Sequence, residues 1–444
     1  MSLRKWVSPL VVAGAAGMVT GAEAPKPTYE QLEARVQQLE SAVQDLHANQ
    51  AAGPNTQDVQ NVVEQVIRDA DQRSQLLQAN GGLQAGYDKG FFIRSDDGAY
   101  VLKPGVQFQF RGIYNFNDAD SDESESGFEV RRVRFRFDGN FISPDLTYSF
   151  VWDTNRNGGA VTLLDAWAQY KFADEWAVKL GQFKESFSHE KDISGFSQLA
   201  VDRSLVDTVL GGNLTDRVQG MALVYGSKEN PFRAEATFSD GDNSKNTDFR
   251  DNIAGTFDAN WGAAGRVEYK VFGDWANYRD FTAKNNKVDL LVAGAGTSYT
   301  ERDSNNTLLN TLDLQYENTS GLGLYGAVHG NFTDLKDAAD DDSRFDWGAL
   351  AQVGYLLNKQ WEVFGRYDVI LLDEDFVTSE DTFNEFTAGV NYYLGQDGSA
   401  LHRAKITVDV VYLPDGSPSA QTGSGITAGE EDQIVLRGQF QLVL

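Results

Sequence analysis

Three arginines stand at every second position in one segment of the chain. Arg132, Arg134 and Arg136 alternate there with valine and phenylalanine. Successive side chains of a β-strand point to opposite faces, and residues two apart are separated by roughly 6.8 Å. The segment therefore predicts a row of guanidinium groups on one face and an apolar surface on the other. Because arginine stays charged and offers a planar fork of donors, such a row suits phosphate or carboxylate groups.

Further cations fall on the polar faces of neighbouring segments. The complete set of candidate anion-binding residues is Arg111, Arg132, Arg134, Arg136, Lys171, Lys179 and Lys184. In a second interpretation, the arginines pair with carboxylates and only hold a wall together. We favour anion binding because the three arginines have only Asp138 to share within their own segment.

Neither catalysis nor a cofactor is indicated. The chain has no cysteine, and its four histidines do not cluster. It contains no nucleophile elbow, zinc-protease motif or phosphate-binding loop motif. We therefore expect a protein that is not an enzyme and that holds no metal or cofactor.

The elements that carry these cations repeat one unit of alternating apolar and polar residues, roughly ten residues long, as in membrane barrels. About sixteen such segments follow one another up to the carboxyl terminus, an even number that suits a closed barrel. The expected strands are 100–116, 128–141, 145–153, 161–172, 175–183, 217–226, 232–239, 260–272, 287–300, 308–317, 321–330, 345–357, 360–370, 383–394, 402–413 and 432–444.

The connections between these segments alternate in length. Those at 143–145 and 227–231 are short, whereas those at 184–216 and 240–259 are long. Short periplasmic turns and long outer loops are typical of transmembrane barrels, and a soluble sandwich has no reason to keep this alternation. We therefore predict an all-β fold, a transmembrane antiparallel β-barrel of about 16 strands. The connection at 273–286 is longer than its periplasmic place predicts.

The longest connection in the first half, 184–216, is unusually apolar for an exposed loop. Its large apolar residues include Phe187, Phe196, Leu199, Leu205 and Val206. We expect it to fold into the barrel, pack these side chains against the wall and narrow the pore. Contact with another subunit is the alternative.

The amino terminus has the layout of a cleaved secretory signal. Arg4 and Lys5 precede a short apolar run, and small residues follow it. We expect the signal peptide to span 1–22 and to be cleaved after Ala22. Cleavage after Ala24 is the alternative, although Pro25 would then follow the bond.

A short helical coiled-coil segment is expected in the periplasm at 28–77, before a barrel domain at 85–444. Apolar residues recur there at heptad spacing, at Tyr29, Leu32, Val36, Leu39, Val43 and Leu46. A single amphipathic helix on the protein's own surface is the alternative. Valine and leucine in these positions favour two-stranded coils, whereas porins are usually threefold, and the sequence leaves this open.

The net charge of −27 argues against nucleic-acid partners. Much of the acidity lies in the long connections, at 118–125, 334–342 and 373–381. We interpret these connections as a solvated outer surface. A second interpretation is bridging by divalent cations to lipopolysaccharide phosphates.

Four short motifs resemble the phosphate-selective porin O/P family. They are VRRVR at 130–134, LDAWAQY at 164–170, GQFKESF at 181–187 and DRSL at 202–205. The similarity covers about 85–444. It implies a sixteen-stranded trimeric outer-membrane porin with a basic constriction that passes phosphate or polyphosphate. Two departures are Ser186, where the family usually has proline, and the terminal Leu444, where it usually has phenylalanine.

Residues and resemblance together predict passive diffusion of small anions, phosphate or polyphosphate, across the outer membrane of a Gram-negative-type envelope. The expected partners are those anions, outer-membrane lipid and lipopolysaccharide, and two further copies in a homotrimer. Peptidoglycan contact through the heptad segment is an additional option. The alternatives are a general or cation-preferring porin, or a structural protein that links the outer membrane to the cell wall.

Overall fold

The computed structural model describes residues 82–444, apart from 89, 117–124, 249–258, 337–342, 377–379, 422 and 430. The expected signal peptide and heptad segment lie outside the described residues and stay predictions. No helix in the described part of the chain is long and apolar enough to cross a membrane.

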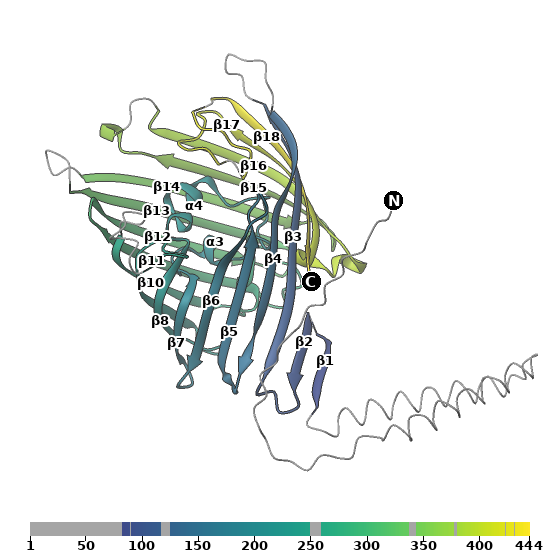
Figure 1. Ribbon diagram of the computed structural model, residues 1–444. Helices are drawn as coiled ribbons and strands as arrows, with labels where there is room; N and C mark the ends of the chain where they lie inside the picture. Colours follow the sequence, from purple (N-terminus) through teal and green to yellow (C-terminus); the bar gives the residue numbers. More distant parts are fainter. Residues whose placement is uncertain are drawn as a thin grey trace, which may run out of the picture. The chain divides into compact units, whose positions relative to one another are not determined.

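Sixteen antiparallel strands, β3 to β18, form a closed ring (Figure 1). The ring closes where β18 pairs with β3, for example at Gly438–Gly112 and Phe440–Phe110. The strands are β3 (Val101–Phe116), β4 (Glu125–Phe141), β5 (Ser143–Thr154), β6 (Val161–Lys171), β7 (Trp176–Lys184), β8 (Arg217–Tyr225), β9 (Phe232–Ser239), β10 (Ala259–Phe272), β11 (Leu290–Arg302), β12 (Asn305–Glu317), β13 (Leu322–Leu335), β14 (Ser343–Leu356), β15 (Trp361–Leu371), β16 (Thr382–Tyr393), β17 (Ala404–Leu413) and β18 (Gln433–Val443). The predicted barrel and its strand number are confirmed.

A hairpin of β1 (Leu83–Tyr87) and β2 (Phe91–Ser95) precedes the ring. Strand β2 joins the edge of β3 through two residue pairs only, Ile93–Leu102 and Arg94–Val101. Since β18 pairs with β3 only from Gln107 onwards, the hairpin extends one edge of the sheet and does not interrupt the ring.

The strands turn most of their apolar side chains outward and most of their polar side chains inward. On β12, Leu312 and Leu314 are 66% and 50% exposed, whereas Asp313 and Gln315 are 6% and 1% exposed. An outward arginine near the middle of a bilayer would cost about 2–4 kcal/mol, so this parity fixes which face meets lipid. The inner face of the ring is therefore mostly polar.

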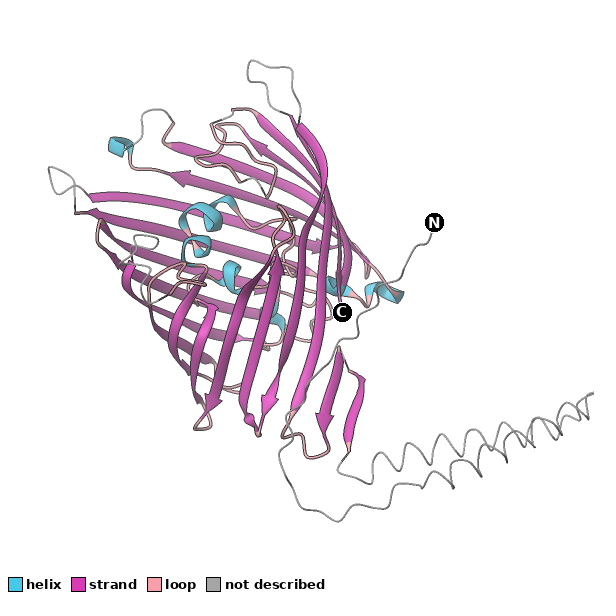
Figure 2. Ribbon diagram, viewed as in Figure 1, coloured by secondary structure: helices cyan, strands magenta, loops and turns pink. Residues whose placement is uncertain are grey.

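The connection between β7 and β8, residues 185–216, lies inside the ring and is called the inner loop below. It carries three short helices, α3 (His189–Asp192), α4 (Leu205–Leu210) and α5 (Gly212–Thr215), drawn in cyan in Figure 2. Ser188 and Ser204 cap α3 and α4 by accepting hydrogen bonds from backbone N–H groups.

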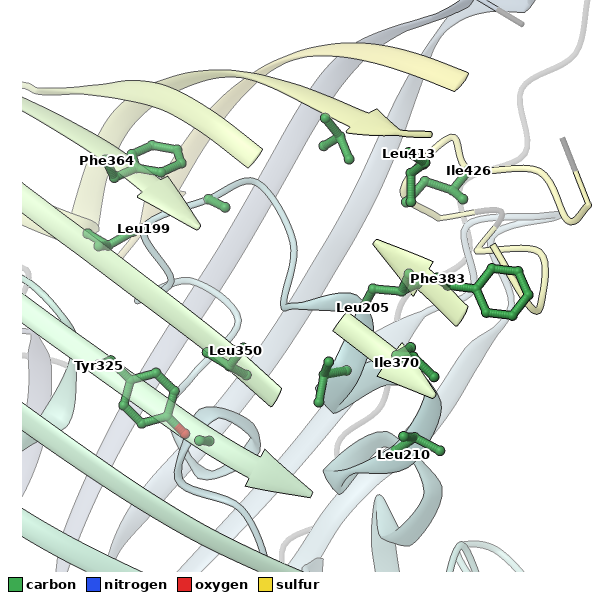
Figure 3. Close-up of a cluster of buried hydrophobic side chains, with 14 of the residues drawn as sticks. Leu199, Leu205, Leu210, Tyr325, Leu350, Phe364, Ile370, Phe383, Leu413 and Ile426 are labelled. Atoms are coloured by element: carbon green, nitrogen blue, oxygen red, sulfur yellow. The ribbon is translucent and has the colours of Figure 1, made fainter. Parts of the chain in front are cut away.

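A hydrophobic cluster joins the inner loop to the inner face of the wall (Figure 3). Leu199, Leu205 and Leu210 from the loop pack in the same cluster as Leu350 and Ile370 from β14 and β15. This confirms that the apolar connection folds into the barrel. The loop approaches β11 so closely that a Cβ on Gly296 would lie 2.2 Å from the carbonyl oxygen of Phe187.

A second segment folds inward from the opposite end of the barrel. It is the connection between β10 and β11, residues 273–289, called the inner turn below, and contains η2 (Asn277–Arg279). Trp275, Tyr278 and Phe281 are all buried within it. The extra length noted in the sequence is thus used to fill the barrel. The remaining short helices are η3 (Glu374–Phe376), η4 (Gln396–Gly398) and η5 (Leu401–Arg403).

Candidate functional site

A hollow of about 410 Å³ lies between the inner loop and the first strands of the ring, and is called the basic pocket below. Seven cationic side chains line it, with three carboxylates. The cations are Arg132, Arg134, Arg136, Lys179, Lys184, Arg203 and Arg217, and the carboxylates are Asp165, Asp192 and Glu235. Five of the predicted anion-binding residues therefore meet in one place.

The three arginines of β4 line the pocket while each has a polar partner. Arg134 Nε lies 2.9 Å from Asp153 Oδ2, and Arg136 pairs with Asp138. Arg132 Nη1 donates to Gln109 Oε1 at 2.8 Å.

The sequence argument that only one carboxylate serves these arginines is wrong. Asp153 sits directly opposite Arg134 on the adjacent strand β5, a pairing that depends on strand register. The arginines therefore combine two roles, since they bind the wall and still face the hollow.

Lys179 and Lys184 reach the pocket from β7. Lys179 Nζ lies 2.8 and 2.9 Å from the two carboxylate oxygens of Glu235. Lys184 Nζ donates to the backbone carbonyls of Lys191 and Asp192, at 2.7 and 3.1 Å. Lys184 thus ties the start of the inner loop to its first helix.

The other two predicted residues lie outside the lining of this pocket. Arg111 is fully buried, and its Nη1 lies 2.6 Å from Asp202 Oδ2 of the inner loop. Its Nη2 donates to Gln439 Oε1 at 2.8 Å. Lys171 is exposed at the end of β6. The predicted set therefore divides into five residues at the pocket, one loop anchor and one exposed lysine.

Sequence reasoning missed two cations of the pocket. Arg203 comes from the inner loop, where its Nη2 donates to the carbonyl of Ile193 at 2.7 Å. Arg217 opens β8 and its Nε lies 3.1 Å from Asp165 Oδ1. Arg203 belongs to the motif at 202–205, which was a usable signal, whereas the position of Arg217 follows only from how the loop returns to the wall.

The later strands of the ring hold the inner loop by its backbone. Arg366 Nη1 and Nη2 donate to the carbonyls of Asp202 and Arg203, at 3.1 and 3.2 Å. Lys405 Nζ donates to the carbonyl of Gln198 at 2.5 Å. These cations hold the loop on the side of β15 and β17, whereas the hollow lies on the side of β3–β9.

Asp202 stays ionised at the centre of an arginine cluster. Burial alone would raise the pKa of this carboxyl group, but the positive charges of Arg111, Arg131, Arg437 and Arg132 lower it below its ordinary value. A carboxylate held in this way remains charged across the physiological range and anchors the loop to β3 and β18.

Asp192 is the one pocket carboxylate that belongs to a helix of the inner loop. Burial raises its pKa to about 7, against the opposing effects of the Arg266 and Lys184 charges. Its Oδ2 accepts a hydrogen bond from Ser186 Oγ at 2.8 Å. The charge of the basic pocket therefore changes near neutral pH.

A second hollow of about 420 Å³, the second pocket, adjoins the basic pocket. Its charged lining residues are Lys228, Arg233, Arg266, Arg279, Glu235 and Glu268. Ser186 and Glu235 line both hollows. The two hollows therefore meet at these two residues.

Comparison with known proteins agrees with this architecture. The family described as phosphate-selective porin O and P matches residues 102–329, slightly more than half of the 444 residues. Comparison with curated proteins finds no match.

Solved porins share the fold at low sequence identity. An anion-selective porin from Comamonas acidovorans is 14% identical, with a TM-score of 0.53 over 77% of this chain and 99% of that chain. OmpT of Vibrio cholerae in its trimer form is 10% identical, with a TM-score of 0.51 over 77% and 99%. The outer membrane channel DcaP of Acinetobacter baumannii is 13% identical, with a TM-score of 0.51 over 81% and 100%.

At these identities the solved structures establish the fold alone, whereas the family match covers the strands and the inner loop that build the basic pocket. The chain therefore belongs to the family of phosphate-selective porins O and P, and is a β-barrel porin of the outer membrane.

Proposed function

We propose that this porin passes small anions by passive diffusion, phosphate or polyphosphate among them, through the basic pocket. The carrying observation is that seven cations converge on one hollow beside the inner loop, against three carboxylates. Rings of arginine and lysine are the usual device of anion-selective pores. The inner loop would then act as the constriction.

Four of these cations, Arg134, Arg136, Lys179 and Arg217, form close ion pairs with carboxylates, and this suits conduction. Asp153 and Asp138 partly neutralise Arg134 and Arg136. An anion must bind strongly enough to enter and weakly enough to leave, and several moderate sites in series meet both needs. The arginine forks supply charge-assisted hydrogen bonds to oxyanions at each step.

The acidic outer loops oppose this attraction only weakly if they lie further from the pocket than about 8 Å, the Debye length at physiological salt. The family's description names phosphate, and a solved barrel of the same fold is described as anion-selective. Both support the proposal.

We also propose that three copies assemble, since OmpT, which shares the fold, has been solved in a trimer form. The expected heptad segment at 28–77 would contribute to assembly or to contact with the cell wall. Lipid and lipopolysaccharide are the expected surroundings of the outward apolar face.

The second candidate is a general or cation-preferring porin. It is favoured by the net charge of −27 and by the carboxylates Asp165, Asp192 and Glu235 within the pocket. Reversal potentials of the purified protein in a planar bilayer under a KCl gradient separate the two candidates. Anion passage predicts a reversal potential close to the equilibrium potential of chloride. Phosphate added to one chamber should then block the chloride current. A reversal potential close to the equilibrium potential of potassium would establish the second candidate.

A further inference from the structure

The route between the two pockets passes a single acidic side chain of the wall. Ser186 and Glu235 line both hollows, and Ser186 belongs to the inner loop whereas Glu235 belongs to β9. An ion that moves from one hollow to the other along their shared lining therefore passes the carboxylate of Glu235. How strongly this carboxylate repels a passing anion depends on the cations that pair with it.

Lys179 is the only ion-pair partner of Glu235 within the described ranges of the chain. Both oxygens of the carboxylate meet Lys179 Nζ, at 2.9 and 2.8 Å, and each side chain is only 14% exposed. The pair connects β7 to β9 and so spans β8, where the cross-strand neighbour of Lys179 is the small Ala222.

The cation directly opposite Glu235 on the adjacent strand β10 is engaged by other carboxylates. Arg266 is paired with Glu235 in strand register, but its guanidinium lies 2.7 Å from Asp313 and 2.9 Å from Glu268. Glu235 is therefore balanced by one lysine and by nothing else in ion-pair distance among the described residues.

Cations lie on both sides of this pair. The basic pocket holds Arg132, Lys184 and Arg203 in addition to Lys179, and the second pocket holds Lys228, Arg233 and Arg279. A locally neutral ion pair between two positive hollows interrupts what would otherwise be one continuous positive surface. Continuous positive charge would retain an oxyanion, whereas two separated sites let it move on.

We propose that the Lys179–Glu235 ion pair is a specificity-determining gate of this pore, which divides the basic interior into two anion sites in series. The inference rests on the proposed anion passage. Glu235 sets how easily an anion leaves the basic pocket, and Lys179 keeps Glu235 from repelling it. Neither residue acts as an anion site by itself, since each is engaged by the other.

The two single substitutions should act in opposite directions. Glu235→Gln removes the negative charge, joins the two positive hollows and should lower severalfold the phosphate concentration that half-blocks the chloride current. Lys179→Gln leaves Glu235 unpaired in the route, and should reduce chloride conductance severalfold and shift the reversal potential towards potassium. The double variant Lys179→Gln/Glu235→Gln should return both quantities towards those of the unmodified pore.

A matched control uses an ion pair outside both pockets. Lys359 and Asp397 form an exposed pair, Nζ to Oδ2 3.0 Å, with side chains 71% and 64% exposed. Lys359→Gln and Asp397→Asn make the same charge changes there and should leave selectivity unaltered. Heat-modifiable migration in gels checks that every variant forms the barrel.

The measurements separate this inference from the proposed function. A potassium-selective unmodified pore would overturn anion passage. If the unmodified pore prefers chloride while Glu235→Gln and Lys179→Gln behave like the Lys359 and Asp397 controls, anion passage stands and the gate is overturned. A double variant that keeps the full conductance loss of Lys179→Gln, or the full gain in phosphate block of Glu235→Gln, would also overturn the gate, because coupled residues must compensate each other.

Discussion

The imidazole of His189 stacks on the phenol ring of Tyr278, with centroids 3.7 Å apart and planes 8° apart. One ring belongs to the inner loop and the other to the inner turn, so segments that enter from opposite ends of the barrel meet and brace each other. His189 Nε2 also lies 2.6 Å from Gln315 Oε1, and Tyr278 OH accepts from Arg266 Nη2 at 3.2 Å. The inner loop is thus in direct contact with the segment that enters from the other end of the barrel.

Removal of this ring contact should loosen the inner loop without unfolding the barrel. Tyr278→Ala deletes an aromatic pair worth about 0.5–1.5 kcal/mol beyond its burial. We expect larger and noisier single-channel currents with weaker ion selectivity. Tyr278→Phe keeps the stack and should behave like the unmodified pore. Quiet, unchanged currents in Tyr278→Ala would show that the inner turn does not support the loop.

Asp202→Asn should weaken the attachment of the inner loop to the wall more than Tyr278→Ala does. The substitution keeps the shape of the side chain but leaves Arg111 buried without its 2.6 Å partner, and breaking such a buried pair costs about 3–5 kcal/mol. Single-channel conductance should rise and selectivity should fall. Asp145→Asn, at an exposed position in β5, is the control and should have no effect. Equal conductance in the two variants would contradict the anchoring role of Asp202.

Selectivity should depend on pH through Asp192. Burial raises its pKa to about 7, so the protonated form is favoured in the folded loop. With a raised pKa, the stability contribution is complete below the ordinary carboxyl range and is lost as the pH rises through about 7. As the pH falls through neutrality the pocket loses one negative charge, and preference for chloride over potassium should increase.

Reversal potentials measured across this pH range test the prediction. Asp192→Asn should be more anion-selective at alkaline pH and should lose the pH dependence. An identical pH profile in the variant would assign the titration to another group. Glu190, which burial also brings to a pKa of about 7, lies outside the lining of the basic pocket and is therefore the informative comparison.

The heptad segment should affect assembly and not conduction. Replacing Val36, Leu39 and Val43 by serine removes its apolar seam. We expect unchanged conductance per barrel but a less stable oligomer, or weaker attachment to the cell wall, in detergent-stability and pull-down measurements. Failure of the barrel to form would contradict this separation of roles.

Strand positions were predictable because the period of two is strong wherever one face meets lipid and the other meets water. The expected segment 161–172 and the observed Val161–Lys171 differ by one residue at one end. Strand ends in the long outer loops were less predictable, and β13 continues to Leu335 where 330 was expected. Strand β13 stays paired with β12 as far as Leu335, although the alternation of apolar and polar residues ends earlier.

The site was predictable only in part. Alternation along a strand shows on which face of the sheet a side chain lies, but it does not show which residue that side chain contacts. The row on β4 follows from alternation, but the pairing of Arg134 with Asp153 depends on register between strands. Arg111 has the parity of a lumen residue, yet its guanidinium is engaged by Asp202 from a loop 91 residues away in sequence. The only indication of the inner turn in the sequence was the unexpected length of the connection at 273–286.

The reversal potential under a KCl gradient, measured before and after replacement of Arg132, Arg134 and Arg136 by glutamine, tests the central claim most directly. All three side chains line the basic pocket, so the unmodified pore should prefer chloride. The triple variant should move towards neutral or potassium selectivity, and phosphate should block its chloride current less well. An unmodified pore that already prefers potassium, or a triple variant with unchanged selectivity, would contradict anion passage through this pocket.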